Sequence, residues 1–140
     1  MHRGSLIAFI VLAQFGCSQD TLESYYDTHA VAVASAAMQR GWVPEWLPRT
    51  ATRIHERHNM DASARMWVAD VPVGVEVVLP ASCSPVKATT ASKPPFERDW
   101  WPVGAPTSTD LANSYLVFQC ADSYVGLAAQ GGRLVGWSRT

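Results

Sequence analysis

Apolar residues in the stretch from Thr21 to Gln39 recur at three- and four-residue spacing, which is the period of an amphipathic helix. The apolar face consists of Leu22, Tyr25, Tyr26, His29, Ala30, Val33, Ala37 and Met38. Asp20 is suited to cap the first turn, and Gly41 is suited to end the helix in the left-handed conformation. His29 lies on the apolar face and is interpreted as a packing residue. The pattern predicts a helix over residues 21–39.

Apolar and polar residues alternate in the later parts of the chain, which is the period of a strand. Strands are predicted at 65–71, 114–121, 124–130 and 134–138. Gly131-Gly132 marks a hairpin turn. A further hairpin is expected near residue 60. Residues 73–79 fit either a short helix between two prolines or a strand rich in β-branched residues.

These elements together predict an α+β fold. The N-terminal helix is expected to pack on one face of an antiparallel sheet of about five strands, in two layers. The chain has 140 residues, of which 48% are hydrophobic and 16% charged, so it suits one folded domain rather than a disordered chain. The formal net charge is −1 and no basic run occurs, which argues against nucleic acid as a partner.

The N-terminus has the features of an export signal. The apolar run Leu6–Leu12 is far shorter than the roughly 20 residues that span a membrane. Gly16-Cys17 follows it, and the whole segment resembles a bacterial lipoprotein signal, in which a small residue precedes the cysteine that is acylated. The resemblance implies a removed signal at 1–16, a lipid-anchor linker at 17–20 and a single globular domain at 21–140. The alternative is an ordinary cleavable signal with Cys17 beside the cut.

Lipidation of Cys17 would decide where the protein resides. Several acyl chains hold a protein stably on a membrane that it does not cross. Ser18 follows the cysteine, where an Asp commonly marks retention at the inner membrane in lipoproteins of Gram-negative bacteria. By analogy, we expect the inner leaflet of the outer membrane, with the domain facing the periplasm.

The cysteine count supports this interpretation independently. Three cysteines leave one unpaired in an exported chain. If Cys17 carries lipid, Cys83 and Cys120 remain and are expected to form a disulfide between two elements. The alternative is a pair of buried reduced thiols. No CxxC occurs, so a zinc site is not predicted.

Residues 40–61 contain a pattern that resembles a known family. Arg40-Gly41-Trp42-Val43-Pro44 is followed by Trp46-Leu47-Pro48, Thr50-Ala51-Thr52 and His58-Asn59-Met60-Asp61. The pattern is similar to that of small bacterial lipoproteins with a YbbD-type head domain, although Thr50 and Asn59 replace the usual Ser and Asp. The family carries no established activity, so the resemblance bears on fold and location and leaves the function open. It also favours the helix at 73–79.

Candidate catalytic groups are few. His55 and His58 are three residues apart rather than the four that a zinc protease signature needs, and on a strand they would point to opposite faces. His58 and Asp61 could converge at a turn to hold a metal ion. No Gly-x-Ser-x-Gly elbow occurs. We therefore predict no catalytic residue, metal or cofactor, and keep a small metal-dependent or hydrolytic enzyme centred on His58 and Asp61 as the alternative function.

The Trp100-Trp101 pair is the candidate contact surface for a partner. Exposed aromatic residues there would suit an envelope protein, a peptide or an envelope polymer. The alternative is that one indole packs inward and the other lies against the sheet edge. The sequence thus predicts a small lipid-anchored binding module, tied to the membrane through its anchor, with Trp100, Trp101, His58 and Asp61 as the residues to inspect.

Overall fold

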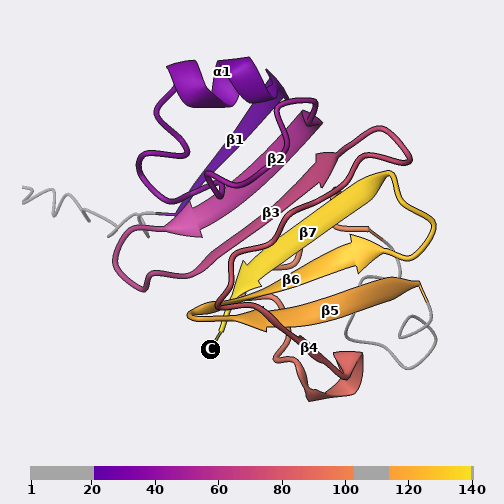
Figure 1. Cartoon of the computed structure of the whole chain (residues 1–140). Coiled ribbons are helices and arrows are strands. Elements are labelled where there is room, and N and C mark those ends of the chain that lie inside the picture. The colour runs from indigo at the N-terminus through magenta and orange to yellow at the C-terminus, as the bar shows by residue number, and fades with distance from the viewer. Residues whose placement is uncertain (1–20, 103–113, 140) are drawn as a thin grey trace, which may run out of the picture.

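The structure is a computed structural model that describes residues 21–102 and 114–139. Seven antiparallel strands form one sheet in the order β1-β2-β3-β7-β6-β5-β4 (Figure 1). The strands are β1 (Thr21–Thr28), β2 (Thr52–Asn59), β3 (Arg65–Asp70), β4 (Ser84–Val86), β5 (Tyr115–Cys120), β6 (Ser123–Ala128) and β7 (Arg133–Ser138). The helical elements in these ranges are α1 (His29–Ala34) and the 3-10 turn η1 (Ala88–Thr90).

The predicted α+β fold with a helix over 21–39 is wrong. Residues 21–28 form the edge strand β1, which pairs with β2 from Thr21 opposite Asn59 to Thr28 opposite Thr52. Only six residues of the predicted helix are helical, in α1. Thr28 caps α1, because its hydroxyl accepts the backbone N–H of Val31 at 3.3 Å, whereas Asp20 lies outside the described residues. The part of the chain that the structure describes is therefore nearly all-β.

The four strands predicted from alternation are present as β3, β5, β6 and β7. The turn at Gly131-Gly132, where both residues have positive φ, leads into β7 as expected. Residues 73–79 are neither helix nor strand but an irregular segment with a turn. Two prolines bound this segment, and Gly74 at φ +88 interrupts it, so neither regular structure can continue through it.

Both faces of the sheet are covered. On the first face, Ile54, Trp67 and Leu134 pack under the segment 29–51, which contributes Leu47 and its neighbours. On the second face, a separate apolar cluster around Trp137 packs under the segment 87–101. The central strands β3 and β7 are consequently buried almost throughout. One layer of sheet thus lies between two irregular covers, which replace the predicted helical layer.

The predicted disulfide is confirmed. Cys83 and Cys120 are joined with an S–S distance of 2.04 Å, so the alternative of two reduced thiols is wrong. Their bond ties the segment that precedes β4 to the end of β5.

None of the helices in the described ranges has the length and apolar composition of a membrane span.

Removing the disulfide should destabilise the domain. The cysteines are 37 residues apart in sequence, and closing a loop of that length contributes about 4 kcal/mol by the chain-entropy model. Cys83→Ser or Cys120→Ser should therefore lower the melting temperature of the oxidised protein, as measured by circular dichroism. After full reduction, the wild type and the variants should have the same melting temperature. If the melting temperatures of wild type and variant differ equally before and after reduction, packing at the cysteines, rather than the bond, is responsible.

Candidate functional site

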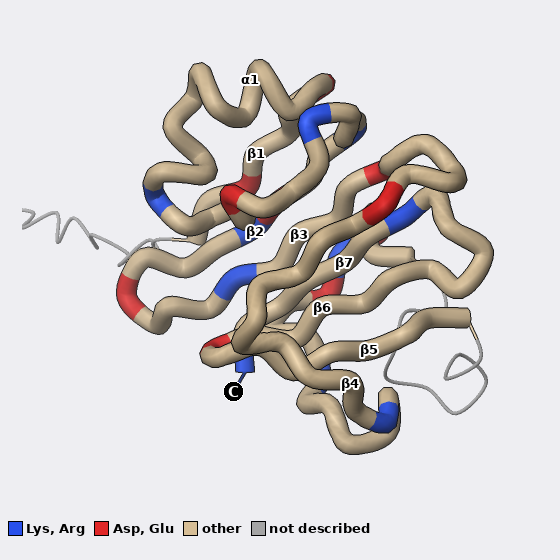
Figure 2. Tube along the Cα trace, viewed as in Figure 1, with Lys and Arg blue, Asp and Glu red and all other residues tan. Residues whose placement is uncertain are grey.

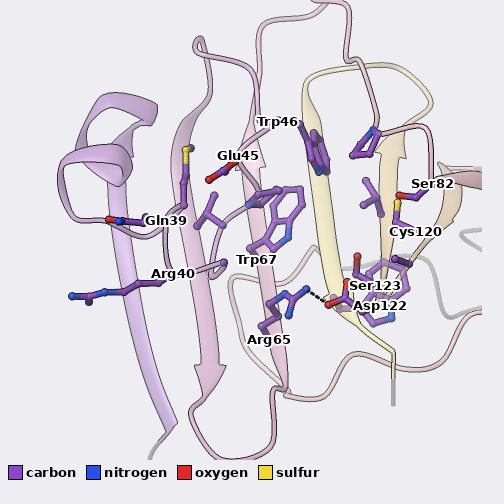
Figure 3. A pocket seen from close by; sticks show the side chains of 18 residues that line it. Gln39, Arg40, Glu45, Trp46, Arg65, Trp67, Ser82, Cys120, Asp122 and Ser123 are labelled. Atoms are coloured by element: carbon purple, nitrogen blue, oxygen red, sulfur yellow. Dashed lines mark hydrogen bonds and ion pairs between the residues drawn. The ribbon is translucent and has the colours of Figure 1, made fainter.

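A groove on the first face of the sheet is the main candidate site (Figure 3). Its volume is about 540 Å³, and we call it the Trp67 groove. The segment 38–46 lines it together with Pro80 and Ser82, and Figure 3 shows Gln39 and Glu45 on the opposite side from Ser82. Two segments far apart in the sequence therefore meet over β3, β7 and β6. Pockets of this size and mixed lining are typical of ligand sites.

Two indole rings, those of Trp46 and the buried Trp67, form a corner within the apolar lining of the groove, which also includes Val43, Pro80 and Val125. Trp67 stands on β3 opposite Gly136 of β7. A Cβ atom at Gly136 would lie 2.4 Å from the indole atoms Cε2 and Nε1 of Trp67, so only glycine allows the ring to rest on that strand. The ring of Trp46 meets that of Trp67 edge to face, with 5.8 Å between the centroids and an interplanar angle of 70°. Trp46 is half-buried, so part of this aromatic corner faces the groove.

Charged groups lie at one end of the groove. Arg65 of β3 donates to the carboxylate of Asp122 at 2.8 Å, and Figure 3 shows this ion pair beside Ser123. The hydrogen bond from Arg65 lowers the pKa of Asp122 below its usual range, although partial burial opposes this. Arg40 points away from the groove in the same view. The groove thus combines an aromatic corner with a pair of opposite charges at its solvent-exposed end.

A buried polar cluster lies beneath the segment 38–46. Glu56 of β2 is fully buried, and its carboxylate is 2.8 Å from Nδ1 of His58. Tyr26 of β1 donates its hydroxyl to the same carboxylate at 3.5 Å. The ring of Trp42 stacks on that of His58, with 4.0 Å between the centroids. Because residues two apart on a strand share a face, Glu56 and His58 could have been paired from sequence once 52–59 was taken as a strand.

The structure does not bring His58 and Asp61 together as a ligand pair. His58 is buried with Glu56, whereas Asp61 is exposed in the turn after β2, where its backbone N–H donates to the side chain of Asn59 at 2.9 Å. In residues 21–102 and 114–139, no group of three His, Cys, Asp or Glu side chains is placed to hold a metal ion. His55 does point to the opposite face from His58, as predicted for a strand.

Trp100 and Trp101 lie on the second face, and both are half-buried. The ring of Trp100 stacks on His55 at a centroid distance of 5.4 Å, and its Nε1 donates to Glu23 at 3.0 Å. Trp101 packs edge-on against Trp137 at 5.8 Å. Both indoles therefore help to cover the sheet, as the alternative interpretation describes. Their use as a partner surface stays a prediction, and Cys17 lies outside the described residues.

The carboxylate of Glu23 accepts hydrogen bonds from several side chains on this second face. Burial raises the pKa of Glu23, but hydrogen bonds from Arg57, Trp100 and Arg98 outweigh it, so the pKa lies below its usual range. Burial lowers the pKa of His55 below its usual range, although the nearby carboxylates of Glu23, Asp70 and Asp99 oppose this. An open depression of about 560 Å³ lies beside Trp100. Its carboxylate and guanidinium groups largely satisfy one another, which leaves it less suited to a ligand than the Trp67 groove.

One comparison with known families gives a match to part of the chain. Residues 20–67 match the YbbD head domain model. The matched region runs from β1 to Trp67 of β3. It includes the buried polar cluster around Glu56 and His58. No curated protein and no solved structure matches the chain significantly.

The residues that carry the YbbD head resemblance have clear structural roles. Gly41 has φ +75, a conformation that favours glycine, and it allows the chain to reverse between Arg40 and Trp42. The reversal places the Trp42 ring on His58 and the Arg40 guanidinium over that indole, 4.9 Å from its centroid. The Arg-Gly-Trp sequence therefore brings a guanidinium group and the imidazole of His58 on β2 into contact with one indole ring.

Proposed function

We propose that the chain is a lipid-anchored binding module of the cell envelope and that the Trp67 groove is its ligand site. The observation that carries the proposal is the aromatic corner of Trp46 and Trp67 beside the Arg65–Asp122 pair. Apolar pockets with a few fixed polar groups are the usual form of a binding site. No described contact favours the alternative enzyme, because Asp61 is exposed and the partner of His58 is Glu56.

The lining of the groove suits an extended peptide segment of another envelope protein. Aromatic-lined grooves bind extended, proline-rich peptides, and Trp46 lines this groove beside Pro44 and Pro80. The Arg65–Asp122 pair and Ser82 supply donors and acceptors for peptide groups. Tryptophan and arginine are also the residue types that contribute most to binding energy at protein interfaces.

The sequence around Cys17 supports the anchor. Three residues separate Cys17 from Thr21, the first residue of β1. A four-residue step spans at most roughly 14 Å, so an acylated Cys17 would hold the first strand close to the membrane surface. A ligand site on such a domain would face partners that lie near the membrane.

Site-directed photo-cross-linking in intact cells tests the groove as the ligand site. A photoreactive amino acid at position 82 lies in the groove, and one at the exposed position 78 of the same irregular segment is the matched control. The proposal predicts a protease-sensitive adduct at position 82 and none at position 78. If the captured partner resists protease, the ligand is an envelope polymer rather than a peptide. Equal yields at both positions, or no adduct at position 82, would contradict the groove as the site.

Replacing the proposed acylation site should release the protein. Cys17→Ala removes the thiol that would carry lipid, and several acyl chains are what hold such a protein stably on a membrane. Cell fractionation should move the variant from the membrane pellet to the soluble periplasmic fraction, whereas Cys83→Ser should stay in the pellet. Unchanged sedimentation of Cys17→Ala would contradict the anchor.

A further inference from the structure

Apolar side chains lie around His58 at the end of the sheet where β1 begins. Leu22 is opposite His58 in the β1–β2 pairing, and the ring of Trp42 stacks on the His58 ring with 4.0 Å between the centroids. Met60, in the turn that joins β2 to β3, lines a small pocket together with Trp42 and His58. Leu22 is 52% and Met60 is 58% exposed, while Trp42 is half-buried. We call Leu22, Trp42 and Met60 the Leu22–Met60 patch.

The patch carries little charge. Asp61 is the only charged residue in the turn 60–64, whose trace is mostly tan in Figure 2. The guanidinium group of Arg40 lies 4.9 Å from the centroid of the Trp42 ring, and Arg40 forms no ion pair with any residue in the described ranges. One acidic and one basic group leave no net charge here, so burial of apolar surface has to favour any partner. Tryptophan and arginine suit a membrane–water interface, since each has an apolar body and a polar tip.

The length of chain between Cys17 and β1 decides which surface the patch can reach. Five residue steps separate Cys17 from Leu22, and they span at most roughly 18 Å. Thr21 pairs with Asn59, so the turn that carries Met60 lies at the same end of the sheet as the start of β1 (Figure 1). An acylated Cys17 would therefore keep the patch close to lipid, at a high effective concentration.

We propose that the Leu22–Met60 patch rests on the phospholipid surface that holds the lipid of Cys17. Leu22 and Met60 enter the boundary between the headgroups and the acyl chains. The Trp42 indole and the Arg40 guanidinium group lie among the headgroups. The inference rests on the proposed lipid anchor, because two exposed side chains offer less apolar area than a single acyl chain, which by itself binds a membrane only marginally. A tether alone leaves the domain free to rotate, whereas this contact fixes its orientation on the membrane.

Photo-cross-linking to lipid tests the contact. The mature chain, purified with its lipid, is reconstituted into vesicles of phosphatidylcholine, which carries no net charge. A photoreactive amino acid replaces Met60 or, as the control, Leu116, which is 60% exposed but lies on β5, which four strands separate from β1. We expect a phospholipid adduct at position 60, identified by its mass, and none at position 116. No adduct at position 60, or equal yields at both positions, would overturn the proposal.

A charge in the patch should break the contact. Leu22→Asp should lower the adduct yield at position 60 to that at position 116, because a carboxylate resists transfer out of water. Val33→Asp is the matched control, since Val33 is 51% exposed on α1, which follows the other end of β1, and the yield should stay unchanged. Melting temperatures check that both variants fold. An unchanged yield in Leu22→Asp, or an equal fall in Val33→Asp, would also overturn the proposal.

The N-terminal peptide of the same preparation separates this inference from the proposed function. If mass spectrometry finds an acylated Cys17 but no adduct forms at position 60, the membrane contact is wrong and the anchor stands. An unmodified Cys17 would contradict the anchor and, with it, this inference. Cross-linking at position 82 depends on neither result, so the Trp67 groove is tested separately.

Discussion

Gly136→Ala is expected to lower the free energy of unfolding by about 3 kcal/mol, the upper end of the usual cost of overpacking a core. The added Cβ would lie 2.4 Å from two indole atoms of Trp67. Trp67 is only 4% exposed and is held between β7 and the covering segment, so the ring has little room to move. Urea denaturation monitored by circular dichroism gives the difference in the free energy of unfolding between variant and wild type. The floor of the Trp67 groove should be distorted in the same variant.

A double-mutant cycle provides the control. Trp67→Leu removes the ring that the new methyl group would meet, so Gly136→Ala should cost less than about 1 kcal/mol in that background. Trp67→Leu alone also destabilises the domain, because it leaves a cavity, and the cycle subtracts this effect. The same cost for Gly136→Ala in both backgrounds would show that the clash with Trp67 is not the cause.

Glu56→Ala is expected to destabilise the domain by about 3 kcal/mol, because it leaves buried hydrogen-bonding groups unpaired and a cavity behind. The change leaves Nδ1 of His58 without its partner at 2.8 Å and the hydroxyl of Tyr26 without its acceptor at 3.5 Å. It also leaves a cavity where the fully buried side chain stood. Denaturant unfolding with a tryptophan fluorescence readout is suitable, since Trp42 stacks on His58.

Glu56→Gln is the matched variant. The amide keeps the shape of the side chain and one oxygen that can accept from His58, so its cost should be well below that of Glu56→Ala. If both variants lost the same stability, the negative charge itself would be the important feature. If Glu56→Ala cost less than about 1 kcal/mol, the buried cluster would not stabilise the fold as described.

The meander of β5, β6 and β7 could be predicted from sequence because its strands are adjacent in the chain and a Gly-Gly turn joins two of them. The disulfide followed from the odd number of cysteines. The strand β1 could not be predicted, since Leu22, Tyr25 and Tyr26 fit a helical period, and its stabilising partner β2 lies about 30 residues later. Pairing at that distance overrides a local pattern.

The candidate site was harder to predict than the strands. Residues 40–48 were recognisable by their resemblance, but nothing local shows that they meet Pro80 and Ser82 across the sheet. The same is true of Gly136, whose role depends on a tryptophan almost 70 residues earlier in the chain. His58 was identified as a candidate, yet its partner was expected at Asp61 in the turn rather than at Glu56 on its own strand.

The most direct test of the central claim compares the two faces of the sheet in living cells. The adduct yield at position 82 is measured by mass spectrometry in the wild type, in Trp46→Ala and in Trp100→Ala, with melting temperatures as a check on folding. If the Trp67 groove is the ligand site, one envelope peptide is captured, and its yield falls in Trp46→Ala but not in Trp100→Ala. A yield that survives Trp46→Ala and falls in Trp100→Ala would place binding on the opposite face and contradict the account.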